Sequence, residues 1–263
     1  MGRLAVDVTG HGEPIVLVHG LATTGAIWRR VAPSLARSRS VAAIDVPGFG
    51  ASDPVGRGFD LDAVAQGIRD GLARAGVPEP YDLVGHSMGG AIALTLAAAH
   101  PEAVRGLVLV SPAGLAPVPG AVAAAVGRAA ELYIPLRRYG APLAGHPWGR
   151  RLLMTGGVID AAALAPAEVR RLVSSSRGAR RTREALVAVA AADLRGMLAD
   201  LQRPVGAIIG SGDRVVRPGT LDTIRALRPG AACEAVADAG HISMIERPRQ
   251  FVTALQRVLV AIS

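Results

Sequence analysis

The chain has 263 residues, half of them hydrophobic, which is enough for one large domain or for a domain with an insertion. Its formal charge is +8 and all 29 basic residues are arginine, but aromatic residues make up only 3% and no nucleic-acid-binding module is visible, which disfavours nucleic-acid binding. A single cysteine, Cys233, excludes an internal disulfide and a cysteine-based metal cluster.

Short apolar segments alternate with helical segments along the first part of the chain. Strands are predicted at 3–8, 15–19, 41–45, 81–84 and 106–110, and helices at 61–75 and 88–99. Fully apolar strands that alternate with helices are typical of a parallel sheet covered on both faces. The first strand lacks the apolar core of a signal peptide, and no apolar run reaches the length of a membrane span, so we expect a cytoplasmic protein.

This alternation is interrupted at residues 115–200. The segment contains alanine-rich stretches predicted to be helices at 120–132, 160–173 and 181–200, with no convincing strand. Strands resume at 205–209 and 234–237, and a terminal helix follows. We therefore predict a core formed by residues 1–114 and 201–263, with an inserted helical cap at 115–200 that covers one end of the sheet.

The predicted cap is also the most basic part of the chain. Residues 115–200 contain 12 arginines and 6 acidic residues, a net charge of +6, which leaves +2 for the rest. Such a surface could bind an acidic acyl-carrier protein or the phosphates of coenzyme A. The alternative is a set of solvated helix faces in a chain of arginine-rich composition.

The sequence Gly85-His-Ser87-Met-Gly89 joins the end of a predicted strand to the start of a predicted helix. A sharp turn there exposes the Ser87 hydroxyl at a helix N-terminus, where free N–H groups favour negative charge. Gly85 and Gly89 flank the turn because a Cβ at either position would crowd the strained backbone. This pattern is that of a nucleophile elbow, although the pentapeptide alone is a weak signal.

Other polar residues follow the ends of other predicted strands, where ligands bind in open parallel sheets. Asp213 follows the strand at 205–209, and His241 follows the last strand. Asp213 is our candidate for an acid that orients a histidine, and His241 is our candidate for a general base that reaches Ser87. Asp238 is a rival acid, but it lies only three residues from His241, so Asp213 is preferred.

The loop after the second predicted strand supplies a candidate oxyanion hole. The backbone N–H groups of Leu21 and Met88 are the expected pair of donors. His19 and Gly20 precede this loop, and we expect His19 to brace it rather than to react.

The order Ser87, Asp213, His241 is the order of nucleophile-elbow hydrolases. With it, the sequence resembles the α/β-hydrolase family over nearly its whole length. The segments that carry the resemblance are His19-Gly20, Asp45-Val-Pro-Gly-Phe-Gly-Ala-Ser52, Gly85-His-Ser-Met-Gly-Gly90, Gly210-Ser-Gly-Asp-Arg-Val-Val216 and Gly240-His241. Trp28 occupies a position that the family often fills with tryptophan. The resemblance implies a mostly parallel sheet of seven or eight strands flanked by helices, with Ser87 as nucleophile, His241 as base and Asp213 as orienting acid.

A serine nucleophile disfavours the branches of this family that use an aspartate, the haloalkane dehalogenases and epoxide hydrolases. The leading hypothesis is a carboxylic ester hydrolase for small to medium apolar substrates, with no metal or organic cofactor. A thioesterase or tailoring enzyme for carrier-linked substrates is the second hypothesis. C–C bond hydrolysis, elimination and perhydrolysis use the same residues in relatives, and a non-catalytic ligand receptor is the remaining alternative.

Overall fold

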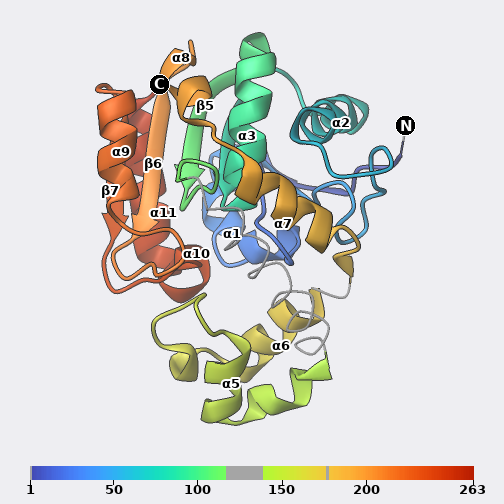
Figure 1. Cartoon of the computed structure of the whole chain (residues 1–263), viewed down its shortest axis with the longest axis vertical. Helices are drawn as coiled ribbons and strands as arrows, with labels where there is room; N and C mark the ends of the chain where they lie inside the picture. Colours follow the sequence, from blue (N-terminus) through green and yellow to red (C-terminus); the bar gives the residue numbers. More distant parts are fainter. Residues whose placement is uncertain (1, 117–138, 176–177) are drawn as a thin grey trace.

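The computed structural model describes residues 2–116, 139–175 and 178–263, which form one seven-stranded sheet flanked by helices (Figure 1). The strands are β1 (Val6–Gly10), β2 (Glu13–Val18), β3 (Arg39–Ile44), β4 (Tyr81–His86), β5 (Val104–Val110), β6 (Val205–Gly210) and β7 (Ala232–Val236). The helices are α1 (Ala32–Leu35), α2 (Leu61–Arg74), α3 (Met88–Ala99), α5 (Pro147–Leu153), α6 (Pro166–Ser175), α7 (Thr182–Ala191), α8 (Arg195–Asp200), α9 (Thr220–Leu227), α10 (Ser243–Glu246) and α11 (Pro248–Ala261). Short 3-10 turns lie at η1 (Gly25–Trp28), η2 (Pro101–Ala103), η3 (Ala141–Gly145) and η4 (Ala161–Ala163).

The strand order is β1-β3-β2-β4-β5-β6-β7. Only β1 is antiparallel to its neighbour, β3, and the other five pairings are parallel. The carboxyl ends of β2 to β7 therefore lie at one edge of the sheet, which is where the sequence places its candidate site residues.

Helices cover both faces of the sheet because successive strand residues point to opposite sides. In β2, Val16 and Val18 join the core beneath α2, α3 and α9, whereas Ile15 and Leu17 join the core beneath α1 and α11. All four side chains are buried. The uninterrupted apolar run from Ile15 to Val18 is the sequence signature of such a doubly covered sheet.

The predicted elements of the core agree with the structure to within a few residues, and the expected mostly parallel sheet has seven strands. The first strand is shifted, from the predicted 3–8 to 6–10, because β1 pairs with β3 along its whole length as an edge strand. No helix in the described part of the chain is long and apolar enough to span a bilayer.

The predictions for the insertion were less accurate. The expected helix at 181–200 is divided into α7 and α8, because Leu194 donates its N–H to the carbonyl oxygen of Gly114 (2.8 Å) and Asp193 accepts a hydrogen bond from the N–H of Arg195 (3.2 Å). The expected helix at 160–173 begins only at Pro166, after the separate turn η4. The stretch at 120–132 lies outside the described residues, and α5 was not predicted.

Of the described helices between β5 and β6, α5 and α6 occupy one end of the molecule, and α8 lies at the opposite end (Figure 1). α5 and α6 lie farthest from the sheet, and α7 runs between them and α3. The buried residues Ala185 and Val189 of α7 belong to the same hydrophobic core as α3. The division into a core and a cap of residues 115–200 remains a prediction.

We expect Phe251→Ala to lower the free energy of unfolding by about 3–5 kcal/mol, because it removes a fully buried ring. The Phe251 ring lies 6.1 Å from that of Trp28, centroid to centroid, in the core beneath α11. Val260→Ala is the matched control, since Val260 lies on the same helix but is 78% exposed. The measurement is urea unfolding of both variants. Equal urea midpoints for the two variants would contradict the assigned packing.

Candidate active site

Ser87 lies at the turn from β4 into α3, and its backbone is strained. Its φ of +53° and ψ of −117° are unfavourable for a residue with a Cβ. The Ser87 N–H donates to the carbonyl oxygen of Val110 on the neighbouring strand (2.9 Å), which holds the turn against the sheet. A Cβ at Gly89 would lie 2.5 Å from the carbonyl oxygens of Val18 and His19, so only glycine fits there.

His241 and Asp213 form a hydrogen-bonded pair beside this turn. The Nδ1–H of His241 donates to Oδ2 of Asp213 (2.9 Å), and both side chains are buried. The other carboxylate oxygen accepts the N–H groups of Val215 and Val216 (2.8 and 2.9 Å). Burial acts to raise the pKa of Asp213, but the hydrogen bond and charge of His241, together with the N–H of Val216, hold this pKa below its usual value.

An ionised carboxylate can only accept hydrogen bonds, so the pair fixes the tautomer of His241. The proton lies on Nδ1, and Nε2 keeps a lone pair that can accept a proton. This is the tautomer that a general base requires.

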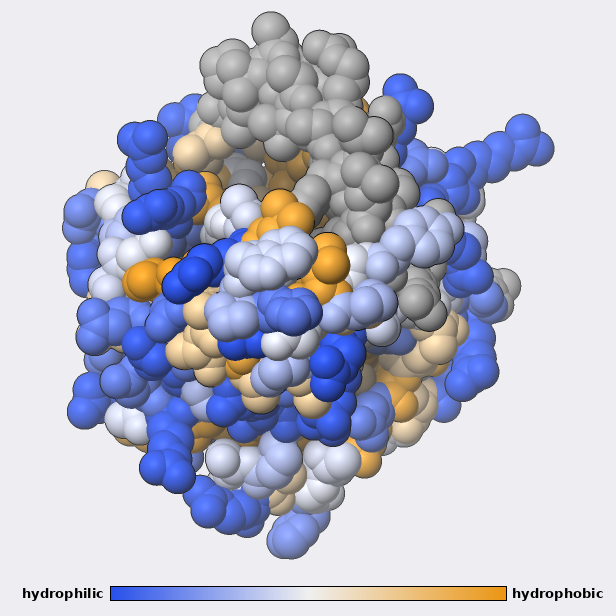
Figure 2. Space-filling view, turned by 90° about the horizontal axis from the view of Figure 1, so that it is seen from below, coloured by the Kyte–Doolittle hydropathy of each residue, from blue (hydrophilic) through white to orange (hydrophobic). Residues whose placement is uncertain are grey.

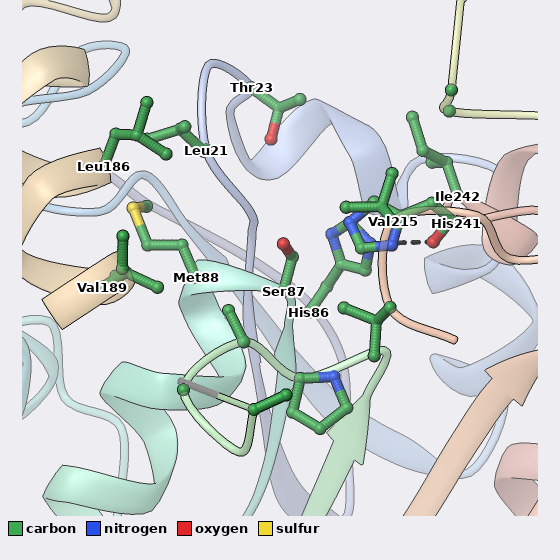
Figure 3. A pocket seen from close by; sticks show the side chains of 18 of the residues that line it. Leu21, Thr23, His86, Ser87, Met88, Leu186, Val189, Val215, His241 and Ile242 are labelled. Atoms are coloured by element: carbon green, nitrogen blue, oxygen red, sulfur yellow. Dashed lines mark hydrogen bonds between the residues drawn. The ribbon is translucent and has the colours of Figure 1, made fainter. Parts of the chain in front are cut away.

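Ser87 and His241 line the same pocket, which has a volume of about 580 Å³ (Figure 3). In this view Ser87 lies at the centre, with Met88 and Val189 on one side and His241 on the other. The pocket opens at the carboxyl ends of the parallel strands. The structure therefore brings together the three residues that were singled out separately in the sequence.

The two expected oxyanion donors are also beside Ser87. Leu21 and Met88 both line the pocket, and Met88 is the first residue of α3, where backbone N–H groups have no partner within the helix. In the part of the chain that the structure describes, neither N–H donates a hydrogen bond to another protein group. Both are available to a substrate oxygen.

His19 bridges two loops next to this pair of amides. Its Nε2 accepts the N–H of Val46 (2.9 Å), and its Nδ1 donates to the carbonyl oxygen of Gly20 (2.7 Å). The hydroxyl of Thr23 donates to the same carbonyl oxygen (2.9 Å). Burial lowers the pKa of His19 to about 4, so its ring is neutral near pH 7 and holds the loop that carries Leu21.

His86 supports the backbone of His241. Its Nε2–H donates to the carbonyl oxygen of His241 (2.9 Å), and the two ring centroids are 4.8 Å apart. Trp28 packs edge-on against His86, with centroids 6.5 Å apart. Burial, with repulsion from a charged His241 as a smaller cause, lowers the pKa of His86 to about 3, so this ring is also neutral.

Glu246 is a residue of this region that the sequence did not single out. Its buried carboxylate accepts three backbone N–H groups: that of Gly240, next to His241 (2.7 Å), and those of Ile159 and Asp160 in the insertion (2.8 and 2.9 Å). It therefore connects the His241 loop to the insertion. The only sequence signal for Glu246 is its position five residues after His241, and this position does not indicate which N–H groups Glu246 binds.

The fold and this arrangement of the site define a hydrolase. The chain belongs to the family of the alpha/beta hydrolase fold, whose family model matches residues 13–248. The resemblance seen in the sequence is thereby confirmed. Within residues 2–116, 139–175 and 178–263, no three side chains of His, Cys, Asp or Glu are grouped as metal ligands.

Known proteins similar to this chain include hydrolases with several substrates. The pimeloyl-(acyl-carrier protein) methyl ester esterase of Methylococcus capsulatus is 31% identical over 254 residues, 92% of each chain. The 2-hydroxymuconate semialdehyde hydrolase of Pseudomonas sp. (strain CF600) is 43% identical over 120 residues, 43% of this chain and 41% of that protein. A thermophilic esterase from Thermogutta terrifontis has a similar structure, with a TM-score of 0.78 at 21% identity over 99% of this chain and 94% of that one. At this identity, the structural similarity shows the fold alone.

We expect Glu246→Gln to slow covalent labelling of Ser87 by a small fluorophosphonate about 10-fold or more. The amide NH₂ of glutamine would face an N–H donor, so at least one of the bonds that hold the His241 loop is lost. Glu168→Gln is the matched control, because Glu168 is similarly buried but pairs with Arg171 within α6.

Both variants should be labelled well below their melting temperatures, so that unfolding does not contribute. A labelling rate for Glu246→Gln equal to that of the wild type would show that this carboxylate does not position the base.

Proposed function

We propose that the protein is a serine hydrolase that cleaves carboxylic esters with small to medium apolar acyl groups. Ser87 is the nucleophile, His241 the general base and Asp213 the acid that orients it. The observation that carries the proposal is the Asp213–His241 hydrogen bond beside a strained serine in a shared pocket. No metal or organic cofactor takes part in the proposed reaction.

The reaction follows from the positions of these groups. His241 Nε2 takes the proton of the Ser87 hydroxyl as Oγ attacks the ester carbonyl carbon, and the carbonyl oxygen becomes an oxyanion. The N–H groups of Leu21 and Met88 stabilise that oxyanion. His241 then returns the proton to the leaving alcohol, which gives an acyl-enzyme, and a water activated by His241 releases the acid.

The pocket supports the choice of an apolar acyl group. α7 contributes Leu186 and Val189 to its wall, and Met88 lies beside them (Figure 3). A volume of about 580 Å³ fits acyl chains of small to medium length. A cytoplasmic location is part of the proposal, and the single cysteine, Cys233, is compatible with a reducing compartment.

We expect Ser87→Ala to lower kcat/KM for p-nitrophenyl esters by about 10³-fold or more, and Asp213→Asn by a similar factor, because the second change destroys the preferred tautomer of His241.

Activity should peak at a medium acyl length in a series of p-nitrophenyl esters from acetate to dodecanoate. Ser175→Ala, on α6 and outside the pocket lining, is the control and should keep wild-type activity. Equal rates for wild type and Ser87→Ala would disprove the proposal.

A carrier-linked ester or thioester is the second candidate substrate. It is supported by the relatives named pimeloyl-(acyl-carrier protein) methyl ester esterase, which include the Methylococcus capsulatus protein and one from Stenotrophomonas maltophilia that is 31% identical over 98% of this chain. Another relative is named for a C–C hydrolase reaction, which the same three residues could perform on a different substrate.

The described arginines of the insertion differ in their availability to a carrier protein. Arg150, Arg180 and Arg181 direct their guanidinium groups to backbone carbonyl oxygens within the chain. Arg151 and Arg170 are exposed. Seen from the end at which α5 and α6 lie, hydrophilic residues cover much of the surface, with smaller hydrophobic patches between them (Figure 2).

If an acidic carrier binds this face, the double variant Arg151→Gln/Arg170→Gln should lower kcat/KM for a carrier-linked methyl ester several-fold and leave a free methyl ester unaffected. Added salt should reproduce the loss in the wild type. The same double substitution at Arg37 and Arg249, exposed arginines outside the insertion, is the control. An equal effect on both substrates, or on neither, would remove the carrier proposal and leave the esterase proposal intact.

A further inference from the structure

The walls of the pocket differ on the two sides of Ser87. On one side lie Leu21, Met88 and the α7 residues Leu186 and Val189, all apolar (Figure 3). The side chains on that side offer a bound group only hydrocarbon and sulfur.

The other side begins with Val215 and Ile242, near His241 in the same view. The segment that follows Val215 adds Arg217 and Thr220 to the lining. Among the described residues of the lining, Arg217 is the only Arg, Lys, Asp or Glu. The described lining therefore combines an apolar wall with one cation, which stands on an exposed residue.

The guanidinium of Arg217 has no hydrogen-bond or ion-pair partner among the described residues. The nearest acidic residues in the sequence are both engaged elsewhere: Asp213 with His241, and Asp222 with Arg225 (2.9 Å).

A guanidinium on an exposed residue of a mostly apolar pocket, with no partner among the described residues, favours an anionic ligand group. Its planar set of N–H donors matches a carboxylate or a phosphate and binds either in a bidentate manner. The hydroxyl of Thr220, which lines the same part of the pocket, can donate a further hydrogen bond.

We propose that Arg217 and Thr220 form an anion subsite, so that the preferred substrate is an ester with an apolar part against α7 and a carboxylate or phosphate at its other end. This inference rests on the proposed esterase function and adds a charge requirement to it. Ser87 then acts on an ester bond between the two ends.

Three octanoate esters of similar length, which differ only at the end of the alcohol part, test the subsite: butyl octanoate, the octanoate ester of 4-hydroxybutanoic acid and the octanoate ester of 3-hydroxypropyl phosphate. The wild type should prefer one or both anionic esters over the neutral ester by about 10-fold or more, mainly through a lower KM. The anionic ester that the wild type prefers shows whether the subsite binds a carboxylate or a phosphate. Arg217→Gln should remove this preference, because it should lower kcat/KM for the anionic esters about 10-fold more than for butyl octanoate.

Arg214→Gln is the matched control, because Arg214 is an exposed arginine on the same loop that does not line the pocket. The inference is overturned if the wild type hydrolyses all three esters equally, or if Arg214→Gln has the same effect as Arg217→Gln. Absence of Ser87-dependent turnover of every ester would instead refute the proposed function. The two failures are therefore distinguishable.

Discussion

The site depends on a backbone conformation that Ser87 would not adopt by itself. A φ of +53° in a residue with a side chain costs on the order of 1–3 kcal/mol, so the surrounding structure has to impose it. β4, which leads into the turn, is buried along its whole length between β2 and β5, and α3, which leaves it, is buried over most of its length. The central position of this strand and helix fixes the turn and points the hydroxyl into the pocket.

The electrostatics of the site distinguish one histidine from two others. His19 and His86 are buried and hydrogen-bonded to backbone groups, and burial lowers the pKa of each well below 6.5. His241 alone is paired with a carboxylate. The two neutral rings therefore support the loops around His241, which is the histidine that we propose as the general base.

Much of the fold and of the site was predictable because it is local in the sequence. Apolar strands, a glycine-flanked serine and polar residues after strand ends can be recognised without knowledge of spatial neighbours, and this was enough to select Ser87, Asp213 and His241. Contacts between distant segments were not predictable. Glu246 binds backbone groups 86 and 87 residues away, and the break between α7 and α8 depends on the Gly114 carbonyl oxygen. Neither leaves a pattern in the sequence.

The arginines of the insertion have a consequence for how such a segment can be built. Short helices and turns leave many carbonyl oxygens without an N–H partner. Arg150 alone supplies donors to the carbonyl oxygens of Ala144, Gly145 and Ala162, and does so from three nitrogen atoms in one plane. A lysine ammonium cannot match this geometry. In such a segment, arginines that bind backbone carbonyl oxygens stabilise the irregular backbone and also add positive charge. Part of the charge of +6 therefore comes from arginines that hold the segment together rather than from recognition of a partner.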